Sequence, residues 1–318
     1  MPSSRGGLAP LRRKPKQLTE APALYQQGSG APLVVDVDLG GTRGPGDLLA
    51  PAGGQGVLVT HQRASLRAVG DLLEDRVPDR EVSAMAQRIA RRLSLRRRAR
   101  DPRAERGSGR TVSVPYRYRS DDIDLDRTIE VLTERPVPDD TDIIVRERMR
   151  SRRAVLLIVD VSGSMRGEKV RMAAATVAAL SADLADDQLA VVAFWSDAAL
   201  LTPLEEQVPA ARLLDLLLRV PARGLTNVHF ALTVAQAELA RSAARRRSAV
   251  LLTDAVHNAG PDPRLVARRF PELHVLLQTD GEHDAPLGAD LARLGHGRFA
   301  PVATHRDVAP ALNRVLAG

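Results

Sequence analysis

Apolar runs alternate with stretches of helical periodicity through the second half of the chain. Residues 154–159 and 249–253 contain no charged residue. Unbroken apolar runs of this length are typical of strands that are buried on both faces of a parallel sheet. Residues 168–185 and 228–241 instead place apolar side chains at the spacing of one helical face. This alternation predicts an α/β domain over residues 148–318, with a Rossmann-like, doubly wound and mostly parallel sheet.

Six strands are predicted in this domain. They are residues 154–159, 188–194, 199–201, 249–253, 273–277 and 298–302. The helices between them include residues 210–218, a helix that Pro263 opens behind Asp262, and a final helix over 308–316 with Pro310 in its first turn.

The first half of the chain has a weaker pattern. Residues 1–60 are rich in Gly, Pro and Ala and show no sustained period apart from a short predicted strand at 33–38. They are predicted to be a low-complexity, disordered segment. Residues 61–147 are predicted to form a helical, basic accessory region, in which a helical stripe consists of Val82, Met85, Ile89 and Leu93.

The positive charge of the chain is concentrated in one segment. Residues 88–110 contain ten Arg against one Asp and one Glu, a local net charge of +8, whereas the whole chain carries +7. A solvated charged face explains such a run, and so does a patch for nucleic acid phosphates or an acidic protein surface. Both hypotheses stay open on the sequence alone.

The composition of the chain indicates the cellular compartment in which the protein works. The chain has no cysteine, which excludes disulfides and thiolate chemistry and fits a reducing compartment. No apolar run approaches the roughly 20 residues that a membrane helix needs, and no apolar signal core follows Met1. We therefore expect a cytoplasmic protein without membrane insertion.

Three small polar side chains follow the first buried run. Asp160, Ser162 and Ser164 alternate with Val161 and Gly163, so an extended turn would point the three oxygen-bearing groups the same way. Ligands of open α/β sheets lie beyond the carboxyl ends of the strands. One carboxylate and two hydroxyls suit a hard cation such as Mg²⁺. Capping of the following helix by Asp160 and Ser162 is the simpler alternative.

Asp-x-Ser-x-Ser after a buried strand resembles the metal-ion-dependent adhesion site (MIDAS) of von Willebrand factor A (VWA) domains. The resemblance covers roughly residues 148–318 and implies two further metal ligands from later loops, for which Thr226 and Asp254 are the candidates. It also implies the strand order 3-2-1-4-5-6, with an antiparallel third strand at the edge. The bound ion would be Mg²⁺ or Mn²⁺, with one position left for a carboxylate of a partner.

The sequence departs from the family pattern at three positions near these ligands. Leu225 and Ala255 stand where the family often has Gly, and Asn227 stands where Asp is common. Four residues are candidates for contacts with a partner at the rim: Trp195, Asp197, Asn227 and His257.

The resemblance extends to the VWA-containing component of magnesium chelatase and to the maturation protein CoxE, which are associated with AAA+ ATPases of the MoxR type. It implies a non-enzymatic adaptor with no catalytic residue, which couples such an ATPase to a client in metal insertion or complex remodelling. Two alternatives are kept. One is nucleic-acid binding through residues 88–110, and the other is a Mg²⁺-dependent phosphohydrolase with His257 near the ion.

Overall fold

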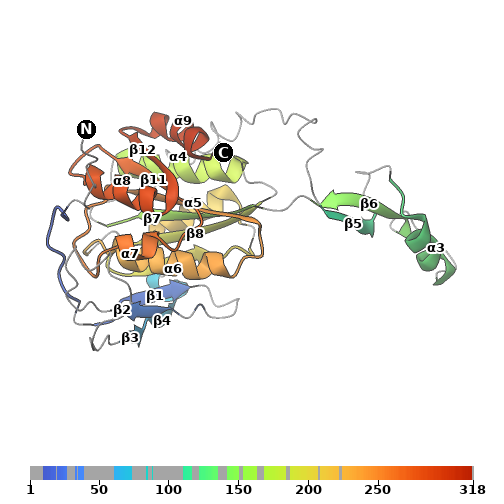
Figure 1. Ribbon diagram of the computed structural model, residues 1–318, viewed down its shortest axis with the longest axis horizontal. Coiled ribbons are helices and arrows are strands. Elements are labelled where there is room, and N and C mark those ends of the chain that lie inside the picture. The colour runs from blue at the N-terminus through green and yellow to red at the C-terminus, as the bar shows by residue number, and fades with distance from the viewer. Residues whose placement is uncertain are drawn as a thin grey trace, which may run out of the picture. The chain divides into compact units, whose positions relative to one another are not determined.

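A mixed sheet of eight strands forms the centre of the fold (Figure 1). In the computed structural model, the described residues are 10–18, 20–26, 33, 35–38, 61–73, 84, 88, 110–116, 122–134, 142–149, 153–162, 168–183, 187–206, 208–221 and 224–316. The chain divides into two compact units, residues 1–97 with 153–318, and residues 98–152. The sheet belongs to the first unit.

The order of the strands confirms the α/β topology expected from the sequence. From one edge to the other it is β12 (His296–Val302), β11 (Leu273–Gln278), β10 (Arg246–Thr253), β7 (Arg153–Asp160), β8 (Gln188–Phe194), β9 (Ala198–Thr202), β1 (Ala23–Gln26) and β4 (Ser65–Ala68). Strands β12 to β8 are parallel, β9 runs antiparallel to β8, and β1 and β4 run parallel to β9. The first six reproduce the predicted order.

All six predicted strands form, but the sheet has two more, β1 and β4, which come from residues ahead of the predicted domain. Strand β9 is not an edge, because β1 pairs with it over Leu24–Gln26 and β4 pairs with β1. Ala23, Leu24 and Tyr25 are buried by this pairing. A run of four residues is too short to show a period, so no local pattern indicates a strand there.

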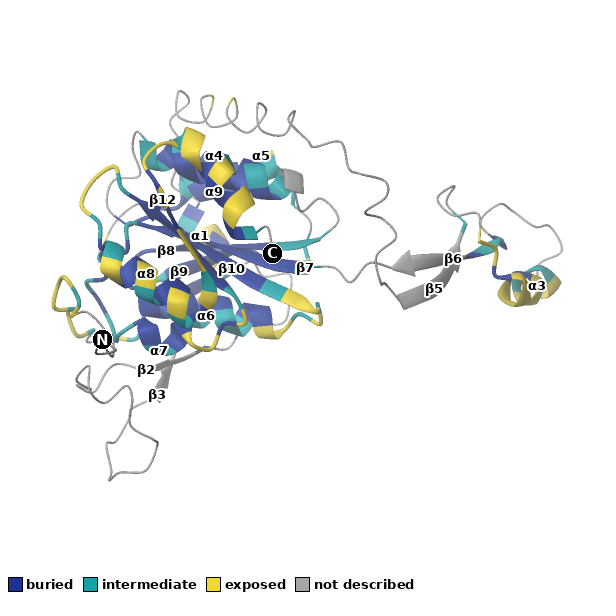
Figure 2. Cartoon of the chain, turned by 45° about the horizontal axis from the view of Figure 1, so that its top comes forward, coloured by how far each residue is buried: buried dark blue, intermediate teal, exposed yellow. Residues whose placement is uncertain are grey.

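Alternate side chains of the central strand enter two different cores. Val155, Leu157 and Val159 pack into one core, and Leu156 and Ile158 pack into the other. Helices α1 (Val69–Leu73), α4 (Glu168–Asp183), α5 (Ala210–Arg219) and α9 (His305–Leu316) cover the first face, and α6 (Val228–Ala240), α7 (Arg264–Ala267) and α8 (Ala285–Leu294) cover the second (Figures 1 and 2). Burial on both faces explains why these strands are continuous apolar runs.

The last helix begins earlier than the sequence pattern predicts. It starts at His305, so Pro310 lies in its second turn and not in its first. The early start has a structural cause. The Asp307 carboxylate accepts a hydrogen bond from the amide of Thr304 (2.8 Å), and Glu168 of α4 accepts one from the amide of His305 (2.6 Å). These carboxylates satisfy amides at the start of the helix.

The segment between residues 61 and 68 is extended, although the sequence pattern predicted helix. Strand β3 (His61–Arg63) pairs antiparallel with β2 (Asp36–Asp38), and β4 follows directly. The predicted stripe Val82, Met85, Ile89 and Leu93 lies outside the described residues, and so does the Arg-rich segment apart from Arg88 and the strand residue Arg110.

The second unit consists of a two-stranded sheet and a helix within its described residues. Strand β5 (Arg110–Pro115) pairs antiparallel with β6 (Ile144–Met149), and α3 (Leu125–Glu134) packs on β6. The Thr128 hydroxyl donates to the carbonyl of Ile144 at 3.1 Å and accepts from its amide at 2.9 Å. In the part of the chain that the structure describes, no helix has the length and apolar character to cross a bilayer.

Candidate metal centre

Asp160 is the last residue of the central strand and lies at the carboxyl edge of the sheet. Its Oδ1 accepts hydrogen bonds from the amide of Ser162 (3.0 Å) and from the Ser162 hydroxyl (2.6 Å). Its Oδ2 accepts one from the Thr253 hydroxyl (2.5 Å). Asp160 is buried, so these neutral donors replace the water that its carboxylate would otherwise bind.

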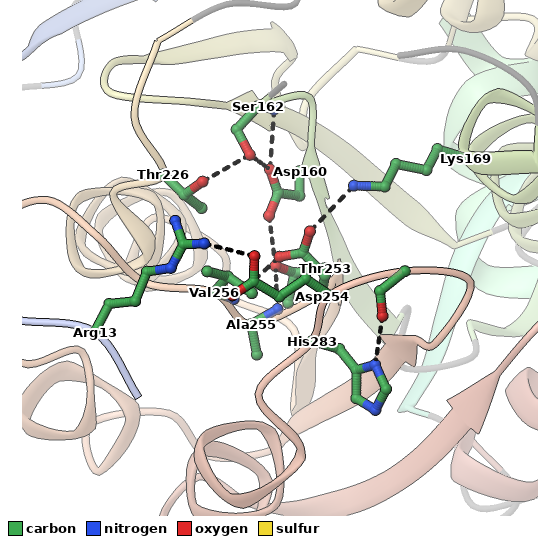
Figure 3. A network of polar contacts seen from close by, with 12 residues as sticks. Arg13, Asp160, Ser162, Lys169, Thr226, Thr253, Asp254, Ala255, Val256 and His283 are labelled. Atoms are coloured by element: carbon green, nitrogen blue, oxygen red, sulfur yellow. Dashed lines mark hydrogen bonds and ion pairs between the residues drawn. The ribbon is translucent and has the colours of Figure 1, made fainter. Parts of the chain in front are cut away.

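Thr226 reaches the same point from the loop before α6. Its hydroxyl donates to the Ser162 hydroxyl at 2.7 Å (Figure 3). Asn227 caps α6 by accepting the amide of Phe230 (3.0 Å), so the start of the helix fixes the residue after Thr226. The amide of Thr226 donates to the side-chain oxygen of Asn258 at 2.7 Å. The loop is therefore held from both sides.

Asp254 follows β10, the neighbour of the central strand. Its Oδ1 accepts the amide of Val256 at 3.0 Å, and its Oδ2 pairs with the Lys169 ammonium at 3.1 Å (Figure 3). Ala255 adopts φ of +60°. This left-handed conformation is unfavourable for a residue with a Cβ, which explains why glycine is the frequent residue at this position of the family pattern.

The charges at the site are unevenly balanced. Burial, and then the nearby negative charge of Asp254, raise the pKa of Asp160 to about 6, although its hydrogen bonds act in the opposite direction. Burial lowers the pKa of Lys169, but the charge and hydrogen bond of Asp254, with Asp160 and Asp280, outweigh it and raise the pKa overall. Two carboxylates thus share the positive charge of one ammonium group.

The structure brings four of the five predicted ligands together. Asp160, Ser162 and Thr226 form one hydrogen-bonded network, and Thr253 links this network to the strand end that carries Asp254. Ser164 lies outside the described residues. Among the described residues, the Asp160 and Ser162 side chains are bonded within this network, and neither accepts a hydrogen bond from an amide of α4.

Three residues of this network were missed in the sequence. Thr253 and Asn258 resemble ordinary loop residues, and Lys169 resembles a solvated residue of the first helical turn. The signal for Thr253 was available, since a hydroxyl residue directly before a predicted ligand at a strand end faces its neighbouring strand. Nothing in the spacing of Lys169 or Asn258 indicates their partners.

The donor set fits a hard divalent cation. Among the described residues, no group of three His, Cys, Asp or Glu side chains is placed to hold a metal ion. Two carboxylates and two hydroxyls remain, and oxygen ligands of this kind suit Mg²⁺ or Mn²⁺. Burial and the nearby charge of Asp254 raise the pKa of Asp160, and a bound divalent cation would favour the ionised form of both carboxylates.

Three of the four predicted partner contacts lie inside the fold, and the fourth is half-buried. Trp195, Asn227 and His257 are buried, with 3%, 1% and 2% of their surface exposed. Trp195 packs on Tyr25 with ring centroids 5.9 Å apart, Asn227 caps α6, and His257 contacts the carbonyl of Gly260 at 3.3 Å. Asp197 is half-buried and accepts the amide of Ala23 at 2.8 Å. These side chains have structural roles.

The position of His257 does not favour the role that the phosphohydrolase alternative gives to this residue. Burial lowers the pKa of His257 to about 4, and its Nδ1 has no hydrogen-bond partner within the described part of the chain. An enclosed imidazole without access to a substrate does not act as a general base.

One protein family matches the segment of the chain that carries this site. Residues 155–257 match the family model of the von Willebrand factor type A domain. An uncharacterized protein from Mycobacterium tuberculosis is 39% identical over 139 residues, which cover 41% of this chain and 21% of that protein. The chain therefore matches only about a fifth of the length of this curated relative.

Solved structures show weaker likeness. The conserved hypothetical protein BatB from Bacteroides thetaiotaomicron aligns over 52% of this chain and 100% of its own, with 15% identity and a TM-score of 0.44. The manganese-loaded TRAP protein of Plasmodium vivax aligns over 51% of this chain and 72% of its own, with 17% identity and a TM-score of 0.41. The residues matched by the family model include Asp160, Thr226 and Asp254, and the strand order of the sheet is that of a VWA-like α/β fold.

Proposed function

We propose that this protein is a metal-dependent adaptor for protein–protein recognition, and not an enzyme. The observation that carries the proposal is the convergence of Asp160, Ser162, Thr226 and Asp254 from three separate loops at one edge of the sheet. Together with Ser164, these residues would hold Mg²⁺ or Mn²⁺. When bound, the ion would supply an electron-poor centre that attracts an anionic oxygen of a partner.

The residues around the site support binding over turnover. Asp160 is occupied by three donors, and Lys169 is neutralised by Asp254. Neither group is therefore available to move a proton to or from a substrate. An acidic side chain of a client protein, with its carboxylate directed at the ion, is the ligand that suits this site.

The proposed partner is an AAA+ ATPase of the MoxR type, in a complex that inserts metal or remodels a client. The resemblance to chelatase-associated and CoxE-like VWA proteins motivates this partner. The protein would act in the cytoplasm. In this proposal the VWA domain is the part that recognises the client, and the ATPase drives the conformational change.

Metal binding is tested first by calorimetric titration of the full chain with MgCl₂ and MnCl₂. We expect saturable binding by the wild type and none by Asp254→Ala. Asp215→Ala is the matched control, because Asp215 is an exposed carboxylate on α5, and it should bind like the wild type. Absence of heat with both metals in the wild type would overturn the metal-dependent function.

The partner is tested by pull-down of a purified MoxR-type ATPase from the same source. Recovery should fall on addition of EDTA and with Asp254→Ala, and it should be unchanged with Asp215→Ala. Equal recovery with and without metal would show that the metal centre does not take part in this interaction.

A further inference from the structure

The chain ahead of the sheet runs along the edge where the candidate ligands lie. The described residues of segment 10–26, here called the N-terminal strap, contact loops that are more than 170 positions away in the sequence. In Figure 1 the strap is the blue segment at the left, which leads into β1. It contacts three loops, and each of these loops is bonded to a candidate metal ligand or to its neighbour.

The first contact is a short parallel bridge between Lys16 and Ala259. The amide of Lys16 donates to the carbonyl of Asn258 at 2.9 Å, and the amide of Gly260 donates to the carbonyl of Lys16 at 3.1 Å. Because only backbone groups take part, this contact fixes the path of the loop after β10 for any residue at position 16 except proline.

Asn258, which the strap contacts, is also hydrogen-bonded to the candidate ligand Thr226. Its side-chain oxygen accepts the amide of Thr226, and its own amide donates to the carbonyl of Thr226 at 3.1 Å. The Thr226 hydroxyl then donates to Ser162, which donates to Asp160. An unbroken series of hydrogen bonds therefore connects the strap with the carboxylate at the end of the central strand.

The second contact reaches the backbone of Asp254. The amide of Arg12 donates to Asp284 at 3.3 Å, and the amide of Asp284 donates to the carbonyl of Asp254 at 2.9 Å. Arg13 pairs with Glu282 at 2.5 Å beside this point, close to the network in Figure 3. Both partners of that ion pair are about half exposed, so it adds little to the contact.

The third contact anchors the far end of the strap. The amide of Ala23 donates to Asp197, whose carbonyl accepts the amide of Trp195 at 2.9 Å. The carbonyl of Trp195 accepts the amide of Asn227, the residue after Thr226, at 2.8 Å. Strand β1 begins at Ala23, so the strap is tied into the sheet at this point.

From these contacts we infer that the N-terminal strap is a positioning element of the metal centre, and that metal binding and docking of the strap stabilise each other. The inference rests on the proposed metal-dependent function. Residues that orient metal ligands from outside the coordination shell change affinity without touching the ion. Coupling between two sites is reciprocal, so the ion must also favour the docked strap.

Lys16→Pro tests the inference, because proline has no amide hydrogen to donate to Asn258. Lys16→Ala is the matched control, since it removes the charge and keeps the amide. In titrations of the full chain with MnCl₂, we expect Lys16→Pro to bind about tenfold more weakly than the wild type and Lys16→Ala to bind within about twofold of it.

Hydrogen exchange gives a readout that does not require metal. In EDTA, Lys16→Pro should speed exchange at the amides of Thr226 and Asn258 relative to Lys16→Ala, and leave the amides of β11 unchanged. In the wild type, saturating MnCl₂ should slow exchange at the amides of Lys16 and Ala23. A variant that only destabilised the whole domain would speed exchange in β11 as well.

The outcomes separate this inference from the proposed function. If the wild type binds Mn²⁺ and Lys16→Pro binds it equally well, the inference is overturned and the metal site stands. If the wild type binds no metal, both the proposed function and the coupling between metal binding and strap docking are overturned. Faster exchange at Thr226 and Asn258 in Lys16→Pro would then support only a positioning role for the strap. Unchanged exchange there would overturn that role too.

Discussion

The two carboxylates of the candidate metal centre lie on adjacent strands but in contrasting surroundings. Asp160, after the central strand, is buried and accepts hydrogen bonds from neutral donors only. Asp254, after β10, is partly exposed and pairs with an ammonium group. The first carboxylate therefore organises the loops around it, and the second is held by a cation that a metal ion could displace. Asp160 is expected to determine folding as well as binding, and Asp254 mainly binding.

The largest expected effect separates these two roles. Asp160→Ala should lower the unfolding free energy in EDTA by about 3 kcal/mol, because it leaves the amide and hydroxyl of Ser162 and the hydroxyl of Thr253 without their acceptor. Asp254→Ala should lower it by about 1 kcal/mol, since it removes one partly buried ion pair and one amide acceptor, against the three donors that Asp160→Ala leaves without their acceptor. Urea denaturation measures both. Equal losses would contradict the distinction.

The dependence of stability on pH also distinguishes the surroundings of Asp160 from those of another buried group, His257. Asp160 has a folded-state pKa of about 6, above its ordinary value, so its contribution makes the protein more stable as the pH falls from 7 to 5. His257 has a folded-state pKa of about 4, below its ordinary value, so its contribution is lost as the pH falls through the same range. The two effects oppose each other.

His257→Gln removes the second effect. Relative to the wild type, its unfolding free energy should change by about 2 kcal/mol in the stabilising direction when the pH falls from 7 to 5 in EDTA. Urea denaturation of both proteins at the two pH values measures the difference. If the two proteins respond to pH in parallel, His257 is not the group that loses stability in acid.

A smaller effect concerns the ammonium group beside Asp254. Lys169→Met should strengthen binding of Mg²⁺ about fivefold, because Lys169 competes with the ion for the Asp254 carboxylate, and an exchange of this size corresponds to about 1 kcal/mol. Lys169→Arg retains the charge and should bind as the wild type does. Calorimetric titration of the wild type and the two variants with MgCl₂ measures these affinities. Weaker binding by Lys169→Met would mean that the ammonium organises the site instead of competing for it.

The smallest effect concerns the backbone after Asp254. Ala255→Gly should stabilise the protein by about 0.5 kcal/mol, because glycine adopts the positive φ of this residue without strain. Ala259→Gly is the control, since Ala259 is equally buried but has no positive φ, and glycine there should destabilise. Thermal unfolding in EDTA would show the two shifts in opposite directions.

Much of the fold was predictable because burial on two faces leaves continuous apolar runs, such as the strand before Asp160. The loop positions of Thr226 and Asp254 followed from the family pattern. The surroundings of those residues were not predictable. Lys169 meets Asp254 only through the packing of α4, and Asn258 meets Thr226 only through the meeting of two loops. Strand β1 was missed because its partner β9 lies far away in the sequence. The neighbouring contact between Ala23 and Asp197 joins residues that are 174 positions apart, so no local pattern reveals the pairing.

The pairing of β1 with β9 has a consequence for how a partner can bind. Sheets often recruit an extended peptide of another protein at an unpaired edge, where main-chain groups are free to accept it. Strand β9 has neighbours on both sides, so the chain itself fills the place that an incoming peptide would take beside it. Recognition by main-chain addition is thereby excluded next to β9, and a partner that approaches this region must engage side chains.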